Sequence, residues 1–181
     1  MFSQTATSDW FDPGWMFGVE DGFNIVIGNP PYIRQGKIKT LKPILHAQRY
    51  ETFVSTADIY VYFYEKGYRL LKNFGILCFV SSNKWMKEKY GENLRRFLRK
   101  KTQIIKIIHF GGFPVFEQTV DTCIIICKKQ TPLMDWNVKF ANIPSSLESH
   151  QRAIDFIREN LGIIKQNKLS EQAYTLSDER V

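Results

Sequence analysis

The feature that most constrains the fold of this chain is a series of short apolar runs rich in β-branched residues. These runs occupy residues 23–28, 76–81, 103–109 and 120–127. Helical patterns at 58–73 and 91–100 separate the first three runs, which is typical of parallel strands with helices packed on the sheet. Residues 110–119, between the last two runs, are too few for a helical crossover, so these two strands should pair antiparallel. We therefore expect an α/β fold whose sheet is mostly parallel and has a final antiparallel strand.

The remaining segments are more polar. Residues 33–56 have no clean period and are expected to form a long loop, which in a compact domain is usually functional or mobile. Asp58 is a suitable N-cap for the helix over 58–73. Beyond residue 130 the one clear element is a helix near 146–160, which the capping box Ser145-Ser146-Leu147-Glu148 should begin.

Charge is distributed unevenly along the chain, whose net charge is +7. Residues 34–49 hold five Lys or Arg and no acid, and residues 84–106 hold nine against two acids. Such clusters favour a polyanionic partner such as nucleic acid. For the second cluster, a solvated helix face is an equally good interpretation.

The three cysteines, Cys78, Cys123 and Cys127, lie inside apolar runs. They are expected to be small core residues of a reducing compartment, with no metal site. No apolar run approaches the roughly 20 residues that a membrane span needs, and the N-terminus lacks the pattern of a signal peptide. We expect a cytoplasmic protein with no membrane partner.

The stretch Asn29-Pro30-Pro31-Tyr32 directly follows the run at 23–28, and ligands of α/β sheets bind beyond the carboxyl ends of strands. The prolines stiffen the backbone and leave its carbonyls free as acceptors, and the asparagine adds another acceptor. Asn29 Oδ1 and the Pro30 carbonyl could accept both hydrogens of an amino group on a planar ring, which would localise its lone pair. Tyr32 could stack on that ring. The structural alternative is a strand-exit turn with a packed tyrosine.

Three blocks of the chain carry a resemblance to a known family. These blocks are NPPY (29–32), ADIYVYFYEKGYRLLKNFGILCFVSSNKW (57–85) and VFEQTVDTCIIICKK (115–129). Together they resemble the DNA methyltransferases that make N6-methyladenine, of the restriction–modification type in which methylase and endonuclease can share one polypeptide. The resemblance covers about residues 9–130 and implies a partial Rossmann-like methyltransferase sheet. NPPY alone is also shared with N-methyltransferases acting on RNA bases or on a protein glutamine.

The resemblance implies roles for several residues. Asn29, Pro30 and Pro31 would form the catalytic corner that holds the adenine N6, and Tyr32 would stack on the base. Phe116 is the best match for a second aromatic that stacks on the flipped base, with Phe113 less favoured. The alternative for Phe116 is a core aromatic. The base must leave the duplex for its N6 to be reached. The basic residues expected to face DNA phosphates are Arg34, Lys37, Lys39 and Lys42.

The family's cofactor is S-adenosylmethionine, and its partners are double-stranded DNA together with the rest of its own polypeptide or a nuclease or specificity subunit. The glycine-rich turn that holds the cofactor precedes NPPY in this family, and no such turn occurs before Asn29 here. Phe110-Gly111-Gly112 leads into a hairpin and not a helix. We therefore expect residues 1–130 to be the target-base half of a catalytic domain, with no identifiable cofactor-binding residue and an incomplete cofactor pocket. Residues 131–181 would be a connector toward a target-recognition domain.

On this interpretation the isolated chain should not methylate DNA. Two alternatives stay open: an N-methyltransferase acting on RNA or protein glutamine, and a non-catalytic DNA-binding or assembly module that kept the fold.

Overall fold

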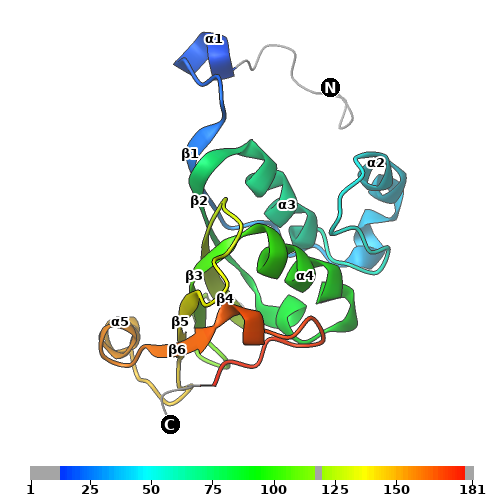
Figure 1. Cartoon of the computed structure of the whole chain (residues 1–181). Helices are drawn as coiled ribbons and strands as arrows, with labels where there is room; N and C mark the ends of the chain where they lie inside the picture. Colours follow the sequence, from blue (N-terminus) through cyan, green and yellow to red (C-terminus); the bar gives the residue numbers. More distant parts are fainter. Residues whose placement is uncertain (1–12, 117–119, 178–181) are drawn as a thin grey trace.

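The computed structural model describes residues 13–116 and 120–177, and its centre is one sheet with the strand order β1-β2-β4-β3-β5-β6 (Figure 1). The strands are β1 (Phe23–Gly28), β2 (Leu71–Ser82), β3 (Gln103–His109), β4 (Thr122–Lys128), β5 (Asn137–Asn142) and β6 (Gly162–Lys165). Strands β1, β2, β3 and β5 run in one direction, and β4 and β6 run in the other. This confirms the expected α/β fold with a mostly parallel sheet, and β4 is the expected antiparallel strand.

The helices cover the two faces of the sheet unequally. Helices α3 (Tyr60–Leu70) and α4 (Glu92–Lys101) lie side by side on one face, and α5 (His150–Glu159) lies on the other, near β5 and β6 (Figure 1). The shorter elements are α1 (Pro13–Phe17), α2 (Lys42–Ala47) and the 3-10 turns η1 (Gln35–Leu41), η2 (Asn83–Met86), η3 (Lys89–Gly91) and η4 (Gln166–Lys168). None of the helices in the described part of the chain has the length and apolar character of a membrane span.

Successive residues of the central strand β4 belong to different apolar clusters, as the two-residue period of a strand requires. Cys123, Ile125 and Cys127 pack in the main core with residues of α3 and α4, and Ile124 packs in the smaller cluster beneath α5. The expectation that these two cysteines are core residues is confirmed. Cys78, in β2, is only partly buried, and all three cysteines are free. The described residues contain no group of three potential metal ligands.

Several expected boundaries differ from the structure. Residues 33–56 are not one loop, because they contain η1 and α2. Helix α3 ends at Leu70 and β2 begins at the next residue, well before the expected start of the strand at residue 76. Phe74 takes a φ of +67°, and the β1–β2 register shifts between Phe23 and Ile25. The irregular backbone near Phe74 and the register shift lie at the start of β2, where the chain passes directly from α3 into the strand.

Both predicted helix caps were wrong. Helix α5 begins four residues later than its predicted capping box, with Ser149 as its N-cap, whose side chain accepts from the Arg152 N–H at 3.2 Å. The earlier serines, Ser145 and Ser146, instead lie within a turn in which the Leu147 N–H donates to the Pro144 carbonyl at 3.4 Å. That turn brings Leu147 against the cluster beneath α5. Asp58 does not cap α3, because its carboxylate is bound to a more distant backbone group described below.

Residues 131–181 add two strands to the same sheet, where the sequence indicated only a helix. Strand β5 pairs parallel with β3, and β6 pairs antiparallel with β5. In β5, Val138 and Phe140 are buried while the lysine between them is exposed. A short half-buried strand of this kind gives a weak sequence signal, because few of its residues are apolar.

Strand β1 was expected to be buried, and this is wrong for one of its faces. β1 lies at the edge of the sheet, with β2 as its single neighbour in the described part of the chain. Ile25 is 63% exposed and Ile27 is 76% exposed. Val26 is half-buried on the α3 side, near Gly67. A parallel sheet is normally covered on both faces, so this open face of β1 is unusual.

Candidate functional site

The Asn29–Tyr32 motif leaves β1 at the carboxyl end of the strand as irregular backbone. The Asn29 and Pro31 side chains are exposed, Pro30 is buried and Tyr32 is half-buried. The first proline is buried, and its ring locks the backbone torsion φ, so the corner is held rigidly against the sheet. The exposed asparagine keeps its amide oxygen available to an external donor.

The motif borders two separate hollows. Tyr32 lines a polar hollow of about 290 Å³, formed where β1, β2 and α3 meet the segment that enters β4. The residues that line it are Tyr32, Arg34, Asp58, Tyr60, Ser82, Lys84, Val120 and Asp121. Two cations and two carboxylates therefore surround a space that is bounded by tyrosine rings.

The first three residues of the motif line the second hollow, which is apolar and has a volume of about 310 Å³. It lies between β1 and α3, and Phe63, Lys66, Leu70 and Phe79 complete its lining together with residues 26–31 and Gly67. Gly67 lets α3 approach the sheet, because a Cβ at this position would lie 2.7 Å from Leu77 Cδ1 and 3.0 Å from Phe79 Cζ.

Tyr32 is held by burial and by one ring contact. Its hydroxyl is buried and has no hydrogen-bond partner among the described residues, and its ring meets that of Tyr60 edge to face, with centroids 6.3 Å apart. Burial and, to a smaller extent, nearby Cys123 together raise the pKa of Tyr32 to about 12. Because the hydroxyl makes no bond, any binding role of this residue rests on its ring.

The backbone that follows Tyr32 is tied to the start of α3. The Gln35 N–H donates to Asp58 Oδ1 at 2.8 Å, and the Ile59 N–H donates to the Ile33 carbonyl at 3.1 Å. The carboxylate that the sequence suggested as a cap of α3 thus caps the first residue of η1. A contact across 23 residues of sequence fixes the exit of the motif.

Tyr60 forms the inner wall of the polar hollow. It is fully buried, and its hydroxyl pairs with that of Tyr90 at 2.9 Å. Burial raises the pKa of Tyr60 well above its usual value, and Tyr90 raises it further. Both hydroxyls are therefore neutral hydrogen-bonding groups at physiological pH. No sequence pattern indicated that Tyr60, Lys84 or Asp121 would lie at this site, because they come from separate elements.

The two candidate stacking aromatics occupy different environments. Phe113 is 3% exposed and packs against Phe110 and His150 in the cluster beneath α5. Phe116 is 40% exposed, which argues against the core-aromatic alternative. The described lining of the polar hollow does not include Phe116. Residues 117–119, which follow it, lie outside the described residues.

The four basic residues proposed to meet DNA divide into two groups. Arg34 lines the polar hollow, and Lys42 Nζ donates to Gln35 Oε1 at 2.8 Å. Lys37 and Lys39 are exposed on η1. None of the four forms an ion pair with another described residue. All four cations therefore remain available to an external anion.

The part of the second basic cluster that lies on α4 is largely used within the protein. Arg96, Arg99 and Lys100 all form ion pairs with Glu171. Glu171 belongs to residues 169–176, which we call the strap, because they lie along α4 and η2. Arg95 is 1% exposed and donates to carbonyls of both the strap and the η2–η3 region. For α4, the structure is thus closer to the solvated-face interpretation than to a free nucleic-acid surface.

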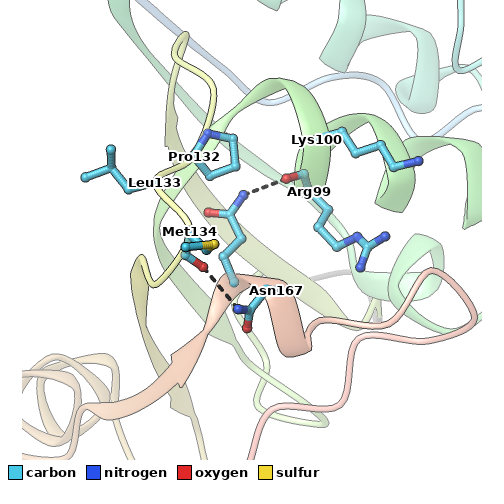
Figure 2. Close-up of a pocket in the computed structure, with 7 residues that line it drawn as sticks. Arg99, Lys100, Pro132, Leu133, Met134 and Asn167 are labelled. Atoms are coloured by element: carbon cyan, nitrogen blue, oxygen red, sulfur yellow. Dashed lines mark hydrogen bonds between the residues drawn. The ribbon is translucent and has the colours of Figure 1, made fainter.

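A third hollow, of about 300 Å³, lies away from the motif and contains none of the candidate site residues. Figure 2 shows it between Arg99 and Lys100 on one side and Leu133 and Met134 on the other. Gln166 also lines this hollow and its side chain donates to the Arg99 carbonyl at 2.9 Å. Asn167 donates to the Met134 carbonyl at 3.0 Å (Figure 2). The first bond joins η4 to α4, and the second joins η4 to the segment before β5. The residues around this hollow thus hold parts of the fold together.

The residues present do not form a complete site for S-adenosylmethionine. The apolar hollow could cover a flat ring, since Phe63, Leu70 and Phe79 line it. Its described lining contains no carboxylate that could accept from ribose hydroxyls, and its one charged group is the cation of Lys66. A sulfonium cation is not stabilised beside a lysine, because like charges repel. The lining of this hollow therefore does not by itself hold the cofactor.

Comparison with known proteins gives one matching family profile. A family described as Eco57I restriction-modification methylase matches residues 2–116. Type II restriction enzyme and methyltransferase RM.Eco57I of Escherichia coli is 30% identical over 112 residues, which is 60% of this chain and 11% of that protein. Type II methyltransferase M.PaeR7I of Pseudomonas aeruginosa is 32% identical over 119 residues, which is 64% of this chain and 21% of that protein. The chain thus spans about a tenth and about a fifth of these two relatives.

Solved structures support the same architecture. A putative class I S-adenosylmethionine-dependent methyltransferase from Listeria monocytogenes superposes with a TM-score of 0.57 at 20% identity. The superposition covers 78% of this chain and 43% of that chain. At this level of identity the likeness concerns the fold alone.

Proposed function

Because the chain belongs to the Eco57I restriction-modification methylase family, we propose that it forms the target-base half of an adenine-N6 DNA methyltransferase. The observation that carries this proposal is the position of Asn29–Tyr32. The motif leaves the carboxyl end of an edge strand and borders a polar hollow on one side and an apolar hollow on the other. A base and a cofactor could thus approach the same corner from different sides.

In this proposal the chain's own residues orient the amino group of an extruded adenine. Asn29 Oδ1 and the Pro30 carbonyl accept the two hydrogens of N6, so that its lone pair points away from the ring system. The rings of Tyr32 and Phe116 stack on the base and exclude water from it. S-adenosylmethionine, when bound, supplies the electrophilic methyl group.

The proposed partner is double-stranded DNA, contacted through the basic segment at 34–49. Arg34, Lys37, Lys39 and Lys42 would lie against phosphates, because these cations have no internal ion pairs among the described residues. Family resemblance adds the rest of a longer polypeptide, or a nuclease or specificity subunit, as protein partners. Residues 131–181 would lead toward a target-recognition domain, although β5 and β6 join the catalytic sheet.

The cofactor half would pack against the open face and free edge of β1. Ile25 and Ile27 would be buried there, as the two-sided burial of parallel sheets requires. A segment bearing a glycine-rich turn could then stand beside Asn29 and supply the carboxylate that the apolar hollow lacks. Without it, the isolated chain should transfer no methyl group to adenine.

The amino-group assignment can be tested by binding alone. The probe is a DNA duplex with adenine opposite an abasic site, where extrusion costs little. The comparison duplex carries unsubstituted purine, which lacks the amino group, at the same position. Two lost hydrogen bonds should weaken binding by about tenfold. Asn29→Ala should reduce this preference, because the Pro30 carbonyl remains as an acceptor, and Asn24→Ala, at an exposed position of β1, should retain it in full.

Equal binding of the two duplexes by the wild-type chain would overturn the assignment. Stronger binding of an RNA duplex, or of a glutamine peptide, would favour the alternative N-methyltransferase functions. A non-catalytic module is tested by mixing the chain with a polypeptide that carries the glycine-rich turn. If DNA is bound but no methyl transfer appears in that mixture, the non-catalytic interpretation gains support.

A further inference from the structure

We propose that Lys84, together with Arg34, holds the phosphates on either side of the extruded nucleotide. This inference rests on the proposed function, since it assigns a residue outside the Asn29–Tyr32 motif to DNA binding at the same hollow. Lys84 is not among the basic residues that the sequence pointed to individually. It lies in η2, where β2 ends, whereas Arg34 follows β1.

The two cations reach the polar hollow from different elements. Arg34 leaves the motif just before η1, and Lys84 enters from the turn after β2. Both side chains are exposed, and neither forms an ion pair with another described residue. The polar hollow thus has one unpaired cation on the Arg34 side and one on the Lys84 side. Such a hollow is suited to a ligand whose uncharged central part carries an anionic group on each side.

A flipped nucleotide has this arrangement of charge. Extrusion rotates the nucleotide about its backbone, so the base enters a pocket while its two phosphates remain at the entrance. A lysine ammonium acts on such phosphates as a point charge. The rings of Tyr32 and Tyr60 are placed for the uncharged base, and Arg34 and Lys84 for the phosphates.

Lys84 stands on a turn with a fixed backbone. Its N–H donates to Ser82 Oγ at 3.4 Å, and its carbonyl accepts from the N–H groups of Lys87 and Glu88 at 3.1 and 2.8 Å. The next residue, Trp85, is fully buried. A cation on such a turn loses little backbone entropy when it binds, which distinguishes it from a lysine on a mobile loop.

The strap holds this turn from the outside. Arg95 donates to the carbonyls of Trp85 and Glu88 in the η2–η3 region, and to those of Glu171 and Gln172 in the strap, the last two at 2.7 Å. The Tyr174 N–H donates to the Met86 carbonyl at 2.8 Å. The wall that carries Lys84 is therefore fixed by residues far along the chain.

The two carboxylates of the hollow act differently on a bound phosphate. Asp58 is occupied by the Gln35 N–H. Asp121 is exposed and forms no ion pair with another described residue, so its charge would oppose a nearby phosphate. Removing Asp121 and removing Lys84 should thus change DNA affinity in opposite directions.

The test measures the salt dependence of binding to the abasic-site duplex between 50 and 200 mM salt, a range in which phosphate contacts dominate. Lys84→Ala should reduce the slope of log K against log salt by about 1. The matched control is Lys139→Ala, an exposed lysine on β5, away from the hollow, which should leave the slope unchanged. Asp121→Asn should tighten binding. Thermal unfolding of each variant checks that the fold is kept.

A second DNA probe tests which phosphates Lys84 contacts. Replacing the two phosphates beside the extruded adenine by neutral methylphosphonates should make wild type and Lys84→Ala bind equally. The proposal is overturned if wild type binds DNA and Lys84→Ala keeps the wild-type slope, or if the difference persists on methylphosphonate DNA. If wild type itself shows no salt-dependent DNA binding, the proposed function fails and this inference fails with it.

Discussion

The backbone N–H of Gln35 donates to Asp58 Oδ1 at 2.8 Å, and this bond joins the segment after Asn29–Tyr32 to the start of α3. A charged acceptor on an η1 backbone donor is among the stronger single hydrogen bonds of a protein. It sets the direction in which the chain leaves the motif. The position of Arg34, between the motif and Gln35, depends on it.

Asp58→Ala should therefore destabilise the protein and loosen the motif. The lost charged acceptor should cost about 1–2 kcal/mol in the free energy of unfolding. Asp58→Asn keeps an oxygen acceptor and should cost less. Urea unfolding measures the two values, and binding of the adenine and purine duplexes tests the motif. Equal stability of Asp58→Ala and wild type would contradict the role given to this bond.

Tyr32→Phe should stabilise the protein, because it removes a buried hydroxyl that has no partner among the described residues. The expected gain is about 1 kcal/mol, since an unpaired buried polar group carries its desolvation cost. Tyr62→Phe is the matched control, because its hydroxyl donates to the Val54 carbonyl at 2.8 Å, and it should lose stability. Stacking on the base should survive in Tyr32→Phe. A loss of stability in that variant would show that its hydroxyl has a partner in solution.

The same residue predicts a response to alkaline pH. Burial raises the pKa of Tyr32 from 10.0 to about 12, so the folded state favours the neutral phenol. A pKa raised by folding gives stability that is fully present below pH 10 and is lost as pH rises toward 12. Tyr32→Phe should lose less stability over this interval than wild type. Unfolding curves measured at pH 9 and at pH 11 would compare the two proteins.

Glu171 predicts a response to acid. Hydrogen bonds from Arg96 and Arg99 are the main causes that lower its pKa from 4.5 to about 2. A depressed pKa gives stability that is present above pH 4.5 and is lost as pH falls toward 2. The strap should therefore loosen from α4 over this interval, and Glu171→Gln should show the loosening already at neutral pH. Limited proteolysis within residues 169–176 would detect it.

The open face of β1 predicts an asymmetry between neighbouring positions. Ile27→Lys should change the stability of the isolated chain little, because the side chain is already largely exposed. Val26→Lys should destabilise it by about 2 kcal/mol or more, since a charge would enter the α3 side of the strand. Thermal unfolding compares the two variants. Ile27→Lys should also prevent association with a polypeptide that supplies the cofactor half, which size-exclusion chromatography of the mixture would show.

The elements nearest the motif were predictable because their patterns are local. The runs that became β1 and β3 were placed to the residue, and α4 within one residue at each end. The position of Asn29 at the carboxyl end of a strand followed from these patterns. The roles given to Asn29, Tyr32 and Phe116 remain predictions, because no bound base tests them.

The features that the sequence did not indicate depend on distant partners. Glu171 pairs with Arg96, 75 residues earlier, and no local pattern shows that this carboxylate would occupy the basic face of α4. Asp58 is a good cap for either α3 or η1, and only the packing of η1 against α3 selects η1. Likewise, Ile25 and Ile27 are of a type that is usually buried, and they are exposed because no described element covers their face of β1.

The strand order has a consequence for the order in which this protein can assemble on the ribosome. β4 lies between β2 and β3, so the two earlier strands have no contact across the sheet until the later one reaches them. The sheet can close only after residue 128 has left the exit tunnel, and η2 is secured only when the strap has followed. Until then β2 and β3 expose unpaired edges, which invite pairing with other chains. Nascent chains shorter than this are therefore expected to engage chaperones, and ribosome-bound chains ending before and after residue 128 should differ sharply in protease resistance.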